Sequence, residues 1–182
     1  MKSVITRRQA RECALQLLFE LDLNPGLDVE EAILRFWRQQ YLVSRHWEKS
    51  ENDLLAMGKP NKPLEEQVVS SKMRVFTETR VRGVLEHLQE IDTALETYTS
   101  NWEVYRLGTV ERNVLRLAYY ELAYCPDVPP PVVLNEAIDL AKYFSNTEAG
   151  RFVNGVLDKL RIELQKKQSA EQAATTTTTQ SV

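Results

Sequence analysis

Two cysteines and two histidines are the residues of this chain best suited to bind a metal ion or to act in catalysis. They are Cys13, His46, His87 and Cys125, and more than thirty residues separate each from the next. Structural zinc sites use closely spaced pairs of ligands, which this pattern lacks. Neither histidine belongs to a catalytic motif, and the sequence has no glycine-rich phosphate-binding loop. We therefore expect no metal site, no cofactor and no catalytic residue.

A cluster of positive charge at the N-terminus offers a different chemistry. The first twelve residues carry four positive charges, on Lys2, Arg7, Arg8 and Arg11, against the one negative charge of Glu12. The whole chain has a net charge of −3 and a pI near 5.6, which argues against a general affinity for nucleic acid. The N-terminal charges therefore predict a local basic patch on an acidic protein.

A helical wheel places these arginines beside two apolar side chains. With Arg7 at zero and about 100° per residue, Arg11 lies near 40°, Leu15 near 80°, Arg8 near 100° and Phe19 near 120°. In one interpretation the arginines bind phosphates while a base of single-stranded RNA stacks on the exposed ring. In the other, Leu15 and Phe19 pack under a second helix and the arginines are a solvated first turn. The wheel favours the two about equally.

Helical spacing of apolar residues continues through most of the chain, so we expect an all-α fold. Thr6 and Asp28 are the expected N-caps of the first two helices, and Thr109 is that of the fourth. Gly155 lies inside the last expected helix, where we expect it to mark a close helix approach. The expected helices are 7–23, 29 to about 41, 74–98, 110 to about 122, 132–144 and 148–164.

Two segments lack this spacing. Residues 44–71 are polar and contain Gly58, Pro60 and Pro63, which predicts a loop-rich insertion. Residues 168–182 are of low complexity and are expected to form a disordered tail after a single domain of residues 1–167. No apolar run exceeds four residues, so we expect a soluble, cytoplasmic protein without a membrane partner.

Three segments of the chain resemble the NusB family of transcription antitermination proteins. They read RRQARECALQLLFELDL, VERNVLRLAYYELAY and DVPPPVVLNEAIDLAKYFSNTEAGRFVNGVLDKL, and the likeness covers roughly 4–37 and 75–164. The resemblance implies two packed three-helix bundles. It also implies binding of the boxA element of nascent ribosomal RNA, a single-stranded RNA, jointly with the small-subunit ribosomal protein NusE in the RNA polymerase antitermination complex.

The resemblance also assigns site residues. The family's arginine-rich motif falls on Arg7, Arg8 and Arg11, and its following aromatic position falls on Phe19. Its Asp-Val-Pro loop falls on residues 127–129. The expected RNA-binding residues are Lys2, Arg7, Arg8, Arg11, Leu15, Phe19, Asp127, Val128 and Pro129.

Two positions depart from the family pattern. Gln9 stands where many relatives have arginine, and Pro131 stands where lysine is common. The loss of two potential phosphate contacts predicts weaker RNA binding by the chain alone than with the ribosomal protein present.

Two other functions compete with RNA-binding antitermination. One is a protein-binding helical adaptor that docks a partner through residues 44–71. The other is an accessory RNA-binding domain, since NusB-like domains also resemble the N-terminal part of certain rRNA cytosine methyltransferases. An aromatic-rich surface would in addition permit a homodimer.

Overall fold

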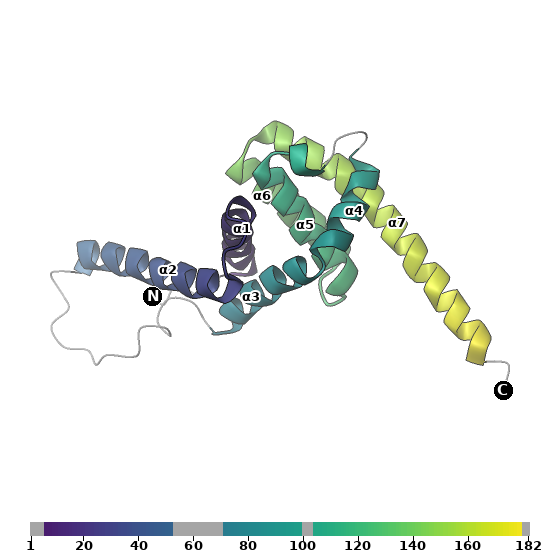
Figure 1. Cartoon of the computed structure of the whole chain (residues 1–182), viewed down its shortest axis with the longest axis horizontal. Helices are drawn as coiled ribbons and strands as arrows, with labels where there is room; N and C mark the ends of the chain where they lie inside the picture. Colours follow the sequence, from purple (N-terminus) through teal and green to yellow (C-terminus); the bar gives the residue numbers. More distant parts are fainter. Residues whose placement is uncertain (1–5, 53–70, 100–103, 180–182) are drawn as a thin grey trace. The chain divides into compact units, whose positions relative to one another are not determined.

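The computed structural model describes residues 6–52, 71–99 and 104–179, with the side chains of 6–40, 72–99 and 104–166. These ranges form helices and no strand, which confirms the all-α fold (Figure 1). The chain divides into two compact units, Met1–Arg82 (unit 1) and Gly83–Val182 (unit 2). The elements are α1 (Arg7–Leu23), α2 (Val29–Asn52), α3 (Ser71–Glu86), α4 (Leu88–Tyr98), η1 (Val104–Arg106), α5 (Thr109–Tyr124), α6 (Pro130–Phe144) and α7 (Thr147–Thr179).

A capping box starts α1. The Thr6 hydroxyl accepts a hydrogen bond from the backbone N–H of Gln9 at 3.3 Å, and the side-chain oxygen of Gln9 accepts one from the backbone N–H of Thr6 at 2.8 Å. The expected N-cap is confirmed, and Gln9, the residue that departs from the family pattern, completes it. At the other end Asn24 caps the helix, and Gly26 has φ of 95°, a left-handed conformation that glycine adopts without strain.

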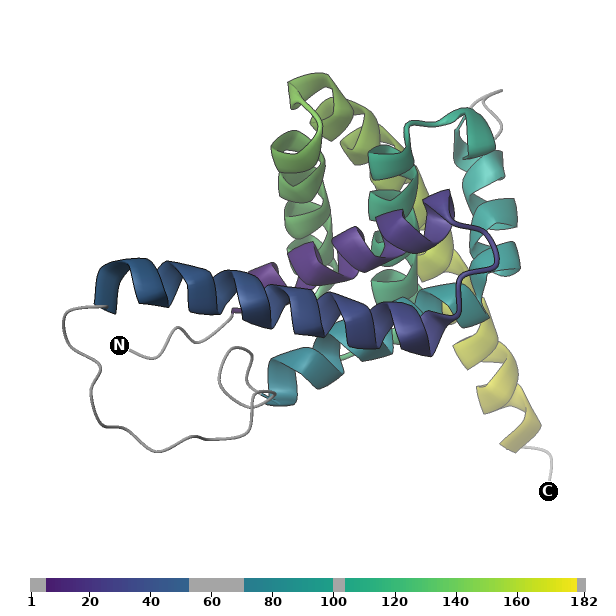
Figure 2. The ribbon, with the colours of Figure 1, turned by 60° about the vertical axis from the view of Figure 1, so that its left-hand side comes forward.

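α1 and α2 lie side by side and are joined by the turn at residues 24–28 (Figure 2). The Glu31 amide donates a 2.8 Å hydrogen bond to the Asp28 carboxylate, as the expected cap requires. α2 does not fade near Tyr41 but continues to Asn52, so the expected insertion begins later than residue 44. The polar residues of 42–52 include neither glycine nor proline, and a helix already formed extends through them at little cost. Residues 53–70 lie outside the described ranges.

The Glu78 carboxylate on α3 joins α3 to α2. It accepts hydrogen bonds from Arg74 at 2.7 Å, from Arg82 at 3.0 Å and from the Trp37 indole at 3.0 Å. Arg82 also pairs through two nitrogens with Glu30, each at 2.8 Å. Burial raises the pKa of Glu78, but the hydrogen bonds from the two arginines outweigh it and lower the pKa below its ordinary value.

This network predicts a pH dependence of stability. Because the pKa of Glu78 is lower in the folded chain, its contribution is present above the ordinary carboxyl pKa of about 4.3 and is lost as the pH falls through the folded value. Glu78→Gln is expected to lower the free energy of unfolding at pH 7 by about 2 kcal/mol. It should also make urea denaturation midpoints less sensitive to pH between about 5 and 3. An unchanged pH profile in the variant would contradict this assignment.

The long helix expected over 74–98 is two helices, because the chain breaks at His87. His87 has φ −100° and ψ 14°, and its ring stacks on that of Tyr124 with centroids 4.0 Å apart. Tyr120 approaches Gly83 so closely that a Cβ there would lie 2.1 Å from the ring. Both tyrosines belong to α5, so the side chains that pack against the chain at this break lie more than thirty residues further along the sequence.

In unit 2, α6 and α7 pack together, and α5 packs against both of them and against α4. The N-cap of α5 is Gly108 rather than the expected Thr109, which occupies the first helical position. α6 begins at Pro130, two residues before expected, since proline with its fixed φ is accommodated in the first turn of a helix. No helix in the described ranges has the length and apolarity needed to cross a bilayer.

α7 extends well beyond the other helices of unit 2 (Figure 1). It begins at Thr147 and continues to Thr179, through most of the segment that we expected to be disordered. A helix that already has a packed stem adds one backbone hydrogen bond for each further residue, so low complexity does not by itself end it.

Candidate nucleic-acid interface

Arg7 and Arg8 provide the accessible positive charge at the start of α1. Both are exposed, and the Arg8 Nε lies 3.4 Å from the Glu12 carboxylate one turn along the helix. The aligned peptide dipoles of the helix add partial positive charge at the same end. This end of α1 therefore favours an anionic group such as a phosphate. Lys2 lies outside the described residues.

Arg11 is not on the exposed face that the wheel predicts. Its residue is only 3% exposed, and its guanidinium carbon lies 5.3 Å from the centre of the Phe76 ring. The Arg80 guanidinium carbon lies 3.6 Å from the same centre. The Thr77 hydroxyl donates a buried 2.9 Å hydrogen bond to the Ala10 carbonyl, which fixes α3 against α1 at this point. Arg11 is thus packed by α3, and its exposure was wrongly predicted.

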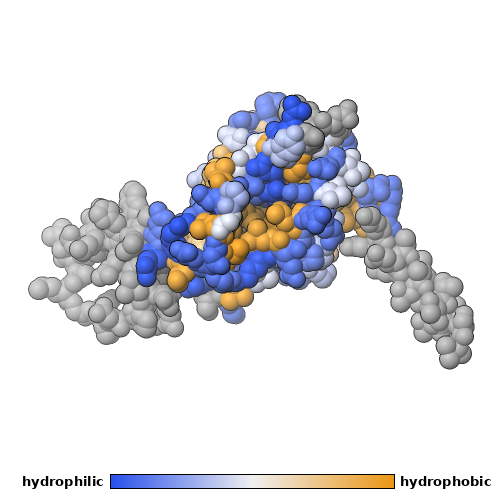
Figure 3. Space-filling view, in the orientation of Figure 1, coloured by the Kyte–Doolittle hydropathy of each residue, from blue (hydrophilic) through white to orange (hydrophobic). Residues whose placement is uncertain are grey.

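Leu15 is also buried, at 2% exposure, so the interpretation that leaves it exposed is wrong. Phe19 remains 37% exposed and Leu23 one turn later 55% exposed. The buried face of α1 therefore includes Arg11 and Leu15 in addition to the expected apolar stripe. Phe19 lies at the edge of this buried face. Figure 3 shows hydrophobic side chains at the surface over α1, among hydrophilic ones. Phe19 therefore presents an exposed aromatic ring at this edge, the kind of side chain on which a base can stack.

The expected loop residues lie in unit 2, between α5 and α6. Asp127 and Pro129 are exposed, whereas Val128 is only 4% exposed and its amide donates to the Cys125 carbonyl at 3.0 Å. Val128 therefore anchors the loop and leaves its two neighbours accessible. The expected site residues form two groups, one in each unit.

Phe76 and Arg80 are the residues of this region that the sequence did not reveal. They follow α1 by more than fifty residues, beyond the insertion that the sequence predicts at residues 44–71, and nothing in the local pattern links them to Arg11. An alternation of apolar and basic residues near 76–82 is the only signal that the sequence offers for them.

Comparisons with known proteins agree on one family. The sequence model of the NusB family matches residues 8–161. The transcription antitermination protein NusB of Lysinibacillus sphaericus is 42% identical over 153 residues, which are 84% of this chain and 94% of that protein.

Solved structures are similar over the same length. A Thermotoga maritima structure described as "T. maritima NusB, P3121, Form 2" is 29% identical, with a TM-score of 0.69 over 90% of this chain and 94% of that one. A structure of antitermination factors NusB and NusE in complex with dsRNA is 28% identical, with a TM-score of 0.61 over 86% and 96% of the two chains. On the family match and this identity across most of its length, the chain belongs to the NusB family.

Proposed function

We propose that this chain is an RNA-binding transcription antitermination factor that binds the boxA element of nascent ribosomal RNA together with the ribosomal protein NusE. The observation that carries the proposal is its similarity, over 86% of its length, to a NusB solved with NusE and double-stranded RNA. The function places the chain in the cytoplasm, in a complex with RNA polymerase.

The distribution of charge supports the first unit as the main RNA-binding part. Residues 1–82 contain 14 Lys and Arg against 12 Asp and Glu, a net charge of +2. Residues 83–182 contain 9 against 14, a net charge of −5. Arg7 and Arg8 would neutralise phosphates, and Phe19 would stack with a base. Arg11 packs against Phe76 and is buried, so it would hold the start of α1 in place rather than contact RNA phosphates directly.

Binding, and no reaction, is the activity that we propose. Burial, together with the smaller effect of the nearby Glu12 carboxylate, raises the pKa of the Cys13 thiol to about 11, so the thiol stays protonated at neutral pH. The exposed pair of Phe19 and Leu23 would also serve as a homodimer surface, and in that case dimer formation would compete with RNA for the same edge of α1.

A salt titration with two RNAs tests the proposal. We expect the full chain to bind a single-stranded boxA RNA more tightly than a scrambled one, with an affinity that falls as salt rises and increases when NusE is added. A duplex containing boxA, measured alongside, shows which form is preferred. Equal, weak binding to boxA and scrambled RNA with no effect of NusE would overturn the proposal and favour the protein-binding adaptor. Equal affinity with and without NusE would contradict the weaker binding expected from Gln9 and Pro131.

A further inference from the structure

Gly155 lies inside α7, in its first third, and no contact among the described residues requires a glycine there. Glycine weakens a helix interior relative to alanine, and it is usually retained where another helix approaches closely. Among the described residues, the structure contradicts the close approach expected from the sequence: Gly155 is exposed, and a Cβ built on it would meet none of their atoms within 4 Å. The space beside this glycine is open, so the described protein atoms do not account for it.

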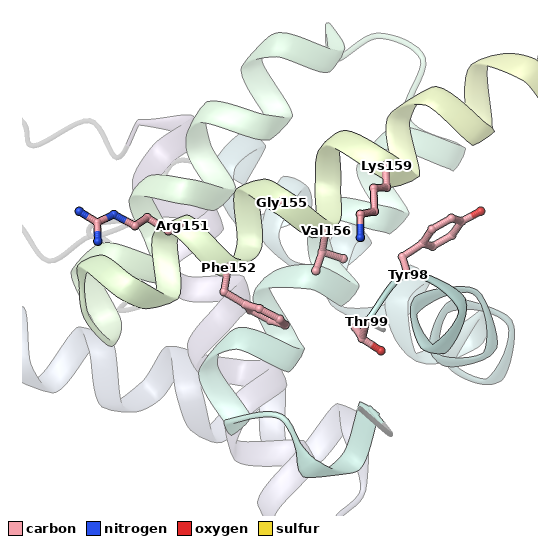
Figure 4. A pocket seen from close by; sticks show the side chains of 7 residues that line it. All are labelled: Tyr98, Thr99, Arg151, Phe152, Gly155, Val156 and Lys159. Atoms are coloured by element: carbon pink, nitrogen blue, oxygen red, sulfur yellow. The ribbon is translucent and has the colours of Figure 1, made fainter. Parts of the chain in front are cut away.

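That space is a cavity of about 360 Å³ within unit 2. Figure 4 shows Phe152, Val156 and Lys159 extending from α7 toward the end of α4, where Tyr98 and Thr99 lie. Gly155 forms part of the α7 wall. Arg151 also borders the cavity, but its side chain points away from the others and pairs with Glu148.

The lining defines the chemistry of a ligand. Phe152 and Tyr98 are partly exposed aromatic rings, and Val156 closes the wall between them at 4% exposure. Lys159 is exposed and has no hydrogen bond or ion pair among the residues that the structure describes. A flat ring that lies against the helix backbone at Gly155 would fit the aromatic wall. A negatively charged group attached to that ring would pair with Lys159. An aromatic surface beside a cation is the combination by which proteins bind single-stranded RNA.

We propose that this cavity binds one nucleotide of the RNA, with its base against Phe152 and the backbone at Gly155 and its phosphate on Lys159. The inference rests on the proposed function and adds a contact in unit 2 to that of α1. It also explains why position 155 is a glycine, because any side chain there would occupy the space of the base.

Substitutions at Gly155 should move stability and binding in opposite directions. Gly155→Ala is expected to raise the Tm by about 2–4 °C, because alanine favours the helix and meets no clash. It should at the same time weaken binding of a boxA RNA with flanking nucleotides. Gly155→Leu, which fills more of the cavity, should weaken binding further. A variant that gains stability and keeps full RNA affinity would overturn the inference.

A charge substitution provides an independent arm with a matched control. Lys159→Gln should reduce the slope of log affinity against log salt, for single-stranded RNA, by about 0.7. It should also lower the affinity about fivefold at 0.1 M salt. Lys166→Gln removes the same charge from α7 outside the cavity, where Lys166 pairs with Glu163 at 2.7 Å, and should change neither. Equal effects of the two substitutions would mean that only the overall charge of α7 matters, which would contradict a site.

NMR separates this inference from the proposed function. Uridine monophosphate added to the ¹⁵N-labelled full chain should shift the amide signals of Gly155 and Val156, and Lys159→Gln should abolish the shift. If these shifts occur in a chain that shows no preference for boxA, nucleotide binding in the cavity is supported and the proposed function is contradicted. If the chain binds boxA specifically but shows no shift and no effect of the cavity variants, the proposed function is supported and nucleotide binding in the cavity is contradicted. Loss of NusE binding in Gly155→Leu with unchanged RNA affinity would assign the cavity to a protein partner and overturn the inference.

Discussion

Reversing the charges of Arg7 and Arg8 is expected to lower the affinity for boxA RNA about a hundredfold at 0.1 M salt. Each phosphate contact contributes about 0.7 to the slope of log affinity against log salt, so losing two contacts gives about 25-fold, and the new negative charges add repulsion. The slope should fall by about 1.4. Fluorescence anisotropy of the Arg7→Glu/Arg8→Glu chain with labelled RNA, over a range of salt concentrations, measures both quantities.

The matched control changes the net charge by the same amount elsewhere. Arg161→Glu with Lys166→Glu, on α7, should leave the salt slope unchanged, and circular dichroism should show both double variants folded. Binding of NusE should persist in the Arg7→Glu/Arg8→Glu chain, since these substitutions remove phosphate contacts rather than the fold. An equal loss of RNA affinity in the two double variants would show that net charge, and not the start of α1, governs binding.

Removing the Asp92 carboxylate is expected to lower the free energy of unfolding by about 3 kcal/mol. Arg116 on α5 donates to the two Asp92 oxygens at 2.8 Å and 2.7 Å, which ties α5 to α4. The Arg116 side chain is only 8% exposed, so Asp92→Ala leaves a buried guanidinium without its carboxylate. Urea denaturation followed by circular dichroism gives the difference.

An exposed ion pair of the same unit provides the comparison. Glu148 and Arg151 are 77% and 71% exposed, and Glu148→Ala should cost less than about 0.5 kcal/mol because solvent screens the pair. Replacing both partners of the buried pair, Asp92→Leu with Arg116→Met, should recover much of the loss by removing the unpaired charge. A similar cost for Asp92→Ala and Glu148→Ala would mean that burial of Arg116 does not set the energy of the pair.

Local interactions made the helices of this protein predictable from sequence. The cap at Thr6, the turn at Asn24 and the cap at Asp28 each depend on atoms within four residues, and all three are present in the structure. The family could be recognised for a related reason, since its motifs are continuous stretches of sequence. The helix after Tyr41 could not be predicted from the spacing of apolar residues. The loss of this spacing shows only that the segment has no buried face, and a lack of burial does not by itself end a helix.

Contacts between distant segments decided which residues of those helices are accessible. The Thr77 hydroxyl reaches the Ala10 carbonyl across 67 residues of sequence, and the packing of α3 that it marks brings Arg11 onto Phe76. In the same way, Tyr124 of α5 stacks on His87 at the break between α3 and α4, and the open space that the described residues leave beside Gly155 exists only in the folded unit. A sequence pattern records what each helix could bury. The tertiary structure determines what it does bury, because the free energy of burial depends on neighbours that the local sequence does not contain.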